Sequence, residues 1–236
     1  MSCGHTHKTW RLCGKINNMN YTLKHLIRQP KTPTKNPALL LMLHGYGSNE
    51  QDLFSFASEL PDELLIVSAQ APMSMGFGQY AWYTISFGAD DSKFSDIPEA
   101  IHARDLIIQF IDELQETYHF DPKRSFLMGF SQGTILSYAV TLTAPDKIKN
   151  ILALSGYIND EMIVLSENKE ELKELSFFCS HGSVDPVIPV EWARKLPKQL
   201  DNYAVQYVYK EYDAGHGIVP NNINDFKNWI NDILLR

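Results

Sequence analysis

The sequence predicts an α/β fold with one mostly parallel central sheet and helices on both of its faces. Short apolar runs alternate along the chain with longer amphipathic segments, an order typical of parallel strands joined by crossover helices. The apolar runs show little polar alternation, as expected for strands covered on both faces. Across the 236 residues there is no linker, repeat or block of charge, so we expect a single domain.

The apolar runs are the expected strands of this sheet. Those over 38–43 (ALLLML) and 64–69 (LLIVSA) are continuous, which favours buried central strands. Prolines between the first two runs mark a turn. The expected strands, in order, are 21–27, 38–43, 64–69, 125–130, 151–155, 177–180 and 205–212.

Four amphipathic segments between these runs are the expected helices. Asp96 followed by Glu99 resembles a capping box and predicts the start of the first helix. Pro197 is expected to kink or end the third helix, because proline removes a backbone donor and clashes with the preceding turn. The expected helices are 98–118, 132–143, 190–200 and 222–234.

Two segments depart from the alternation. Residues 73–96 are aromatic and contain glycine, and a long loop of this kind is often functional, here as a lid or part of a substrate pocket. Residues 157–175 carry a run of charges at their centre. We interpret that run as the solvated face of a helix.

Composition excludes several classes of function. The net charge of −7 disfavours nucleic acid as a partner, because neutralising phosphates needs a basic face. Neither a Lys/Arg-rich block nor an apolar run of membrane-spanning length occurs in the sequence. Three cysteines argue against a disulfide framework and fit a reducing compartment. With no targeting signal evident, a cytoplasmic location is expected.

The first 18 residues are expected to be a polar, poorly ordered extension of a domain spanning 19–236, with Met19 as the hypothetical start of the functional chain. Cys3, His5 and His7 are possible metal ligands. A closed site needs more ligands and a fixed backbone, so no metal is expected here.

A G-x-S-x-G sequence, GFSQG, spans 129–133 between an expected strand and an expected helix. On such a sharp turn a serine projects its oxygen clear of the sheet, at a helix N-terminus that stabilises negative charge. Ser131 is therefore the candidate nucleophile.

Serine needs a base to attack a carbonyl at neutral pH. His216 lies in a glycine-flanked loop after the last expected strand, where sheets present functional groups. His44 and His181 also follow apolar runs and remain alternatives.

The base in turn needs an acid to fix its tautomer. Asp185 follows the expected strand 177–180 on a loop of its own, whereas Asp213 stands only three residues before His216 and competes for this role. We favour Asp185, which places the three groups in the order Ser131, Asp185, His216.

Acyl transfer also needs amide donors for the developing oxyanion. The backbone N–H of Gln132, directly after the serine, is one candidate. The N–H of Tyr46, in the glycine-containing loop HGYG over 44–47, is the other.

Together these motifs resemble the phospholipase/carboxylesterase family of α/β-hydrolases, which includes acyl-protein thioesterases. The resemblance implies an α/β-hydrolase fold and cofactor-free hydrolysis of esters or thioesters, with Ser131, Asp185 and His216 as a catalytic triad. It places the oxyanion donors at Tyr46 and Gln132 and makes Trp82 and Tyr83 candidates for substrate binding. The matching pieces are LHGYG at 43–47, WY at 82–83, GFSQG at 129–133, GSVDPVIP at 182–189 and GHGI at 215–218.

Three residues depart from the family pattern. Tyr46 stands where leucine is common, Thr134 where a smaller residue, often glycine, is usual, and Pro197 within a helix that is usually uninterrupted. Tyr46 bears on the acyl preference, and Thr134 bears on packing more than on chemistry.

The function expected from the sequence is a serine carboxylesterase that forms an acyl-enzyme on a small-molecule ester. An acyl-protein thioesterase, a lysophospholipase or a hydrolase of feruloyl-type esters shares the same chemistry. A non-catalytic binding scaffold would require the loss of a triad member, and none is missing. A metal-dependent hydrolase is disfavoured, because the core shows no cluster at ligand spacing. No sequence feature points to an oligomeric partner.

Overall fold

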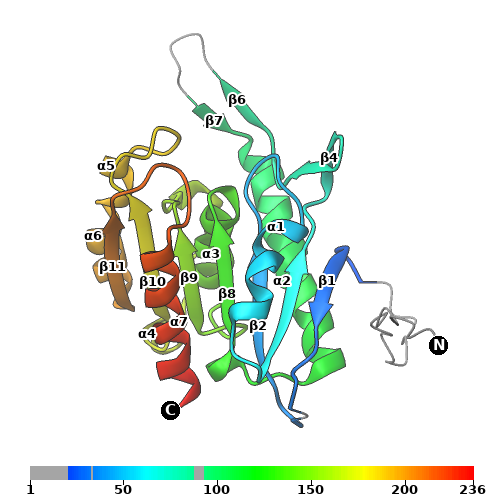
Figure 1. The fold of residues 1–236 in the computed structure, drawn as a ribbon. Helices are drawn as coiled ribbons and strands as arrows, with labels where there is room; N and C mark the ends of the chain where they lie inside the picture. The colour runs from blue at the N-terminus through cyan, green and yellow to red at the C-terminus, as the bar shows by residue number, and fades with distance from the viewer. Residues whose placement is uncertain (1–20, 33, 88–92) are drawn as a thin grey trace, which may run out of the picture.

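A seven-stranded sheet forms the centre of the molecule in the computed structural model, which describes residues 21–32, 34–87 and 93–236 (Figure 1). The strand order is β1-β3-β2-β8-β9-β10-β11, and only the edge strand β1 is antiparallel to its neighbour. The prediction of a mostly parallel sheet is thereby confirmed. The strands are β1 (His25–Arg28), β2 (Ala38–Leu43), β3 (Leu64–Ala69), β8 (Phe126–Phe130), β9 (Asn150–Leu154), β10 (Ser176–Gly182) and β11 (Gln206–Tyr212).

Helices cover both faces of this sheet. Figure 1 shows α7 and α1 in front of the strands, with α2 and α3 behind them. The helices are α1 (Gln51–Phe54), α2 (Ile97–Tyr118), α3 (Gln132–Thr143), α4 (Lys169–Lys173), α5 (Val190–Ala193), α6 (Leu196–Tyr203) and α7 (Pro220–Leu234), with short 3₁₀ turns at Ser55–Glu59, Pro122–Arg124 and Asp160–Met162.

Strand β2 shows why its sequence is apolar at every position. Leu39 and Leu41 pack into a core with α2 and α3, while Leu40 and Met42 pack into a second core with α1 and α7. Successive side chains of a strand point to opposite faces, so a strand between two helical layers needs apolar residues throughout. All six residues of β2 are buried.

Two predicted elements differ in the structure. The expected strand 21–27 pairs with the sheet only from His25, because Tyr21 and Thr22 hydrogen-bond to Thr117 and Glu113 of α2 instead. The expected helix 190–200 is two helices, α5 and α6, separated after Ala193. Pro197 occupies the first turn of α6, where its missing N–H has no intrahelical role.

The other predicted helices agree with the structure. The Asp96 side chain accepts a hydrogen bond from the Glu99 N–H and caps α2 as expected. The charged run within 157–175 forms the short helix α4, whose charged residues are mostly exposed.

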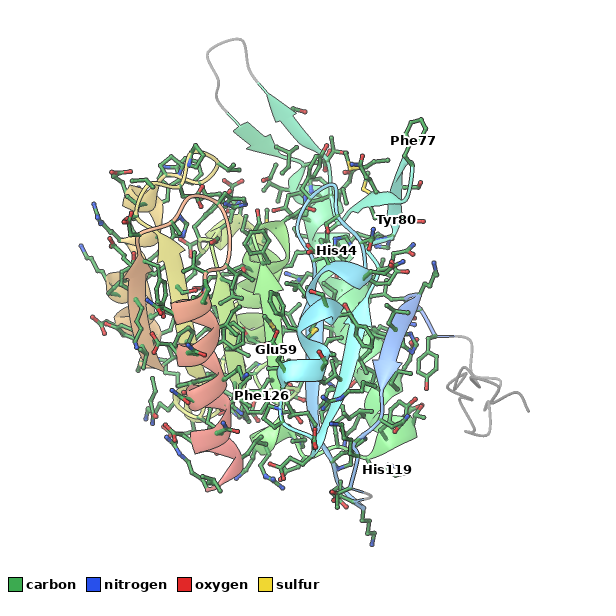
Figure 2. The ribbon with its side chains drawn as sticks, viewed as in Figure 1. His44, Glu59, Phe77, Tyr80, His119 and Phe126 are labelled. Atoms are coloured by element: carbon green, nitrogen blue, oxygen red, sulfur yellow. The ribbon has the colours of Figure 1, made fainter. Side chains whose placement is uncertain are left out.

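The long segment 73–96 folds into two hairpins, β4 (Met73–Gly76) with β5 (Gln79–Ala81) and β6 (Ile85–Phe87) with β7 (Lys93–Ser95). Figure 2 shows Phe77 at the tip of the first hairpin, directed away from the molecule, and its side chain is fully exposed. The β6–β7 hairpin projects beyond the end of the sheet (Figure 1). Residues 1–18, predicted to be a poorly ordered extension with possible metal ligands, lie outside the part of the chain that the structure describes.

We predict that Gly133→Ala destabilises the protein. A Cβ at this position would lie 2.1 Å from the carbonyl oxygen of Leu43, at the crossing of α3 and β2, and overpacking of a rigid core typically costs about 1–3 kcal/mol. Urea denaturation of Gly133→Ala should therefore show a lower midpoint. Gly217→Ala is the matched control, because a Cβ there meets nothing within 4 Å. Equal midpoints for the two variants would contradict the prediction.

Candidate active site

Ser131 sits on a strained turn between β8 and α3. Its φ of 54° and ψ of −116° lie in a region that residues with a side chain rarely adopt. The turn is tight enough that a Cβ at Gly129 would lie 2.5 Å from the carbonyl oxygen of Gly133. This geometry is that of a nucleophile elbow, with the hydroxyl at the N-terminus of α3.

His216 joins Ser131 to Asp185. The Ser131 hydroxyl lies 2.9 Å from His216 Nε2, and His216 Nδ1 lies 2.7 Å from Asp185 Oδ2. A carboxylate only accepts, so Nδ1–H donates to Asp185 and Nε2 is left to accept from the serine. The carboxylate that contacts His216 is thus that of Asp185, whereas Asp213 is exposed to solvent.

The Asp185 side chain is completely buried, and its second oxygen is also satisfied. Oδ1 accepts hydrogen bonds from the N–H groups of Val187 and Ile188 at 2.8 and 2.9 Å. Three donors therefore hold the carboxylate in one orientation. The loop that carries it lies against the histidine loop, because a Cβ at Gly182 would be 2.2 Å from the carbonyl oxygen of Gly215.

The two alternative histidines have structural partners instead of the serine. His181 is buried, with Nε2 2.8 Å from the Ile188 carbonyl oxygen and 3.4 Å from Asp185 Oδ2, so it supports the loop of the acid. His44 accepts a hydrogen bond from the Ala71 N–H at Nε2, and its Nδ1 lies 2.8 Å from the Gly45 carbonyl oxygen. Burial lowers the pKa of His44 below its ordinary value, which favours the neutral ring.

Hydrogen bonds connect the 44–47 loop to the start of α3. Trp82 Nε1–H donates to the His44 carbonyl oxygen at 2.9 Å, and the Trp82 N–H donates to Gln132 Oε1 at 2.9 Å. The amide nitrogen of Gln132 donates in turn to the Tyr83 carbonyl oxygen at 2.8 Å. Sequence analysis did not identify this framework, because two of its acceptors are backbone carbonyl oxygens that no motif marks.

The expected oxyanion donors lie beside Ser131. A Cβ at Gly45 would be 3.4 Å from the Ser131 Cβ, and Tyr46, Ser131 and Gln132 line one cavity. Among the described residues, neither the Tyr46 N–H nor the Gln132 N–H has a hydrogen-bond partner. Both amides are therefore free to bind a substrate oxygen.

The cavity has a volume of about 330 Å³. Of the two candidates for substrate binding, Tyr83 lines it and Trp82, which is buried, does not. The lining residues are Tyr46, Tyr83, Ile85, Ser95, Ser131, Gln132, Ile135, Tyr157, Val187, Ile188, Trp192 and His216.

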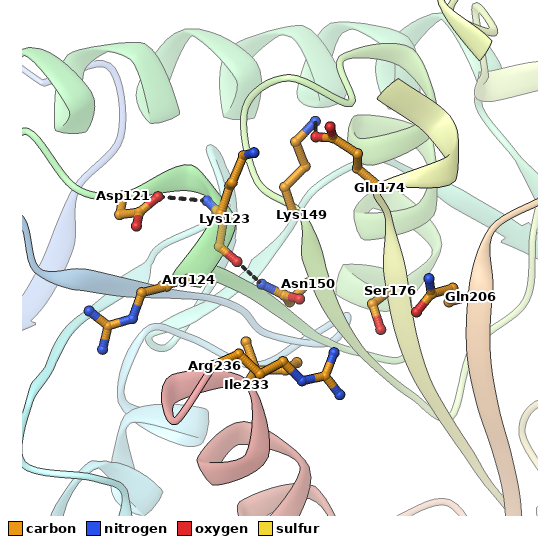
Figure 3. Close-up of a pocket in the computed structure, with 10 residues that line it drawn as sticks. All are labelled: Asp121, Lys123, Arg124, Lys149, Asn150, Glu174, Ser176, Gln206, Ile233 and Arg236. Carbon is orange, nitrogen blue, oxygen red and sulfur yellow. Dashed lines mark hydrogen bonds and ion pairs between the residues drawn. The ribbon is translucent and has the colours of Figure 1, made fainter. Parts of the chain in front are cut away.

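A larger cavity of about 510 Å³ lies at the opposite ends of the strands, where β9, β10 and β11 begin (Figure 3). Its side chains are mostly charged, and Lys149 and Glu174 form an ion pair across it at 3.1 Å. Its lining includes none of Ser131, Asp185 and His216, whereas Ser131 and His216 line the smaller cavity.

The structure describes residues 21–32, 34–87 and 93–236. There, no three or more His, Cys, Asp or Glu side chains are grouped so that they could hold a metal ion. No helix in these same ranges has both the length and the apolar character needed to cross a bilayer.

Comparison with known proteins decides the family. The family model described as phospholipase/carboxylesterase matches residues 24–234. The chain belongs to the phospholipase/carboxylesterase family. It is therefore an α/β-hydrolase and an enzyme that acts on ester bonds.

Several fungal proteins are similar in sequence to this chain. Acyl-protein thioesterase 1 of Kluyveromyces lactis is 29% identical over 76% of this chain and 83% of its own length. Acyl-protein thioesterase 1 of Cryptococcus neoformans is 26% identical to this chain, in an alignment that covers 92% of this chain and 100% of the fungal protein. The crystal structure of the Bacillus cereus carboxylesterase shares the fold, with a TM-score of 0.77 and 22% identity over 91% of this chain and 96% of that one.

One departure from the family pattern has a packing partner. The Thr134 hydroxyl donates to the Leu154 carbonyl oxygen at 2.6 Å and accepts from the Leu154 N–H at 3.1 Å, which ties α3 to β9. Gly156 makes room for it, because a Cβ there would lie 2.4 Å from the Thr134 methyl carbon. The larger residue at 134 is thus accommodated within the core.

We predict that acid destabilises the protein partly through His44. The unfolded chain protonates this residue near its ordinary pKa of 6.5, whereas burial lowers the pKa in the folded state. Its contribution to stability is therefore complete above about pH 6.5 and is lost as the pH falls further. The free energy of unfolding should decline faster below about pH 6.5 in the wild type than in His44→Gln, by at most about 1.4 kcal/mol per pH unit.

Urea denaturation at several pH values measures this difference. Glutamine carries an oxygen that can accept from the Ala71 N–H but cannot titrate in this range. Parallel pH profiles for the two proteins would show that His44 makes no such contribution.

Proposed function

We propose that the chain is a serine carboxylesterase that hydrolyses small-molecule esters through an acyl-enzyme on Ser131. The observation that carries this proposal is the continuous hydrogen-bonded path from the Ser131 hydroxyl through His216 to Asp185, with distances of 2.9 and 2.7 Å. A serine nucleophile needs such a base, and the base needs a group that fixes its tautomer.

In the proposed acylation step, His216 Nε2 takes the Ser131 proton as the oxygen attacks the ester carbonyl. Asp185 stabilises the imidazolium that forms and keeps its proton on Nδ1. The tetrahedral oxyanion accepts hydrogen bonds from the N–H groups of Tyr46 and Gln132, which have no other partner among the described residues. His216 then gives its proton to the leaving alcohol.

Deacylation repeats these roles with water as the nucleophile. His216 removes a proton from the water as it attacks the acyl carbonyl, and the same two amides hold the second oxyanion. Return of the proton from His216 to Ser131 releases the acid and restores the enzyme. Every step uses groups of this chain and water.

Acyl-protein thioesterase activity is the second candidate, supported by the printed names of the fungal relatives. A thioester passes through the same tetrahedral intermediates, so the triad does not separate the two activities. The cavity of about 330 Å³ lies at the small end of the range of about 300–1,000 Å³ for small-molecule sites. A short acyl group fits within this volume, which supports a small ester as the substrate.

We predict that Ser131→Ala lowers kcat for p-nitrophenyl esters by at least about 10⁴-fold, because removal of a triad nucleophile leaves only binding and oxyanion stabilisation. A fluorophosphonate probe should label the wild type at Ser131 and fail to label the variant. Labelling should persist in EDTA, since no metal takes part in the proposed steps.

Ser58→Ala is the matched control, because Ser58 is exposed and far from the site in the chain. It should keep full labelling and turnover. A panel of esters of increasing acyl length, run beside acyl-thioesters, then separates the two candidate activities. Full activity in Ser131→Ala would overturn the proposed mechanism.

We predict that Trp82→Phe lowers kcat about tenfold or more with little change in KM. The variant leaves the buried His44 carbonyl without its donor, which costs about 1–3 kcal/mol and loosens the loop that carries the Tyr46 amide. Each 1.4 kcal/mol lost from transition-state binding is a factor of ten in rate. Steady-state kinetics with a short p-nitrophenyl ester measures the effect.

Trp229→Phe is the control for this substitution, since Trp229 packs against Phe126 and Phe178 on the opposite face of the sheet. It should leave kcat near that of the wild type. Equal losses of kcat in the two variants would mean that Trp82 acts only through general stability.

A further inference from the structure

The cavity beside Ser131 combines apolar walls with buried hydroxyl groups. Three isoleucines, a valine and a tryptophan contribute apolar side chains to its wall. Tyr83, Ser95 and Tyr157 add polar groups to the same wall. A pocket of this kind binds the apolar body of a ligand by burial and fixes its orientation through a few polar contacts.

Tyr83 has an unsatisfied hydrogen-bonding group in this wall. Its side chain is completely buried, and its hydroxyl has no hydrogen-bond partner among the described residues. Buried tyrosine hydroxyls usually find a partner, because an unpaired polar group in the interior destabilises the folded state. A ligand that enters the cavity could therefore supply the missing partner of this hydroxyl.

The neighbours of the Tyr83 hydroxyl place it at the cavity. Ser95, Gln132 and Tyr157 all influence its ionisation, and all three line the cavity that holds Ser131. Ser95 and Gln132 lie close enough to favour the ionised form, less strongly than burial opposes it, yet neither makes a hydrogen bond of normal geometry with it. The Gln132 amide is already engaged with the backbone of Trp82 and Tyr83.

The hydroxyl keeps its proton at neutral pH. Burial, followed by the nearby phenol of Tyr157, raises the pKa of Tyr83 above its ordinary value. The group is therefore available as a donor to an oxygen acceptor. Ionised carboxylates would be poor occupants, since the surrounding wall is mostly apolar and offers no cation among its lining residues.

We propose that Tyr83 donates a hydrogen bond to an uncharged oxygen substituent of the substrate, and that the enzyme selects small esters whose apolar body carries such an oxygen. Suitable substituents are a methoxy, hydroxyl or keto oxygen on an aromatic or short aliphatic group. This inference rests on the proposed esterase activity and adds a specificity-determining residue to it. A site with an unpaired buried donor disfavours the analogue that lacks the acceptor.

Two pairs of esters test the proposal. Each pair compares a methoxy group with an ethyl group, which has a similar shape but no acceptor. The acyl-side pair is the methyl esters of para-methoxyphenylpropanoate and para-ethylphenylpropanoate. The alcohol-side pair is para-methoxybenzyl acetate and para-ethylbenzyl acetate. In the wild type, kcat/KM for the methoxy member of one pair should exceed that for the ethyl member by about three- to tenfold.

Tyr83→Phe should reduce that ratio to about one. Tyr203→Phe is the control and should retain it, because the Tyr203 hydroxyl bonds to Asp160 and lies outside the cavity. The unfolding midpoint of Tyr83→Phe in urea should equal or exceed that of the wild type, because the variant removes an unsatisfied hydroxyl. A lowered midpoint would mean that the hydroxyl has a structural partner and would overturn the proposal.

The remaining outcomes separate this proposal from the proposed function. Fluorophosphonate labelling of Ser131 together with a ratio of one in both wild-type pairs leaves the esterase intact and refutes the role of Tyr83. Wild-type protein that is neither labelled nor active refutes the esterase. Binding of both pairs to Ser131→Ala, measured by calorimetry, reports on Tyr83 without turnover, and equal dissociation constants for methoxy and ethyl members again refute its role.

Discussion

The hydrogen bond from His216 Nδ1 to Asp185 is the contact on which the arrangement of the site depends. It holds the imidazole so that Nε2 meets the Ser131 hydroxyl, and the loops that carry the two residues lie against each other at Gly182 and Gly215. The parallel sheet makes this meeting possible. Strands β8, β10 and β11 run in one direction, so the loops that follow them emerge at the same edge.

A second framework aligns the opposite wall of the site. Trp82 and Gln132 tie the 44–47 loop to the first turn of α3 through hydrogen bonds that each join a side chain to the backbone. These bonds are buried, and the donors of an oxyanion hole are effective when they are held in position before the reaction begins. The strained backbone conformation of Ser131 lies at the start of α3, which packs closely against β2. Surrounding packing of this kind can hold a residue in a strained conformation.

Continuous apolar runs predicted the central strands with small errors, since a strand buried on both faces leaves a clear pattern. Prediction failed where another contact replaced the expected one. Tyr21 and Thr22 bond to α2 instead of the sheet, and the helix expected over 190–200 is interrupted before Pro197. Trp82, a candidate for substrate binding, stays a prediction: it is absent from the lining of the cavity beside Ser131, and its indole N–H and backbone N–H both donate within the framework.

The sequence by itself determined the fold class and the family, and it predicted Ser131, Asp185 and His216 from the strand ends that carry them. It left His44, His181 and Asp213 as open alternatives, because spacing along a chain does not measure distance in space. Only the tertiary structure decided which histidine meets the serine and which acid meets that histidine. It alone placed the Tyr83 hydroxyl unpaired among residues that line the cavity, since hydrogen bonding between distant segments depends on how the layers pack.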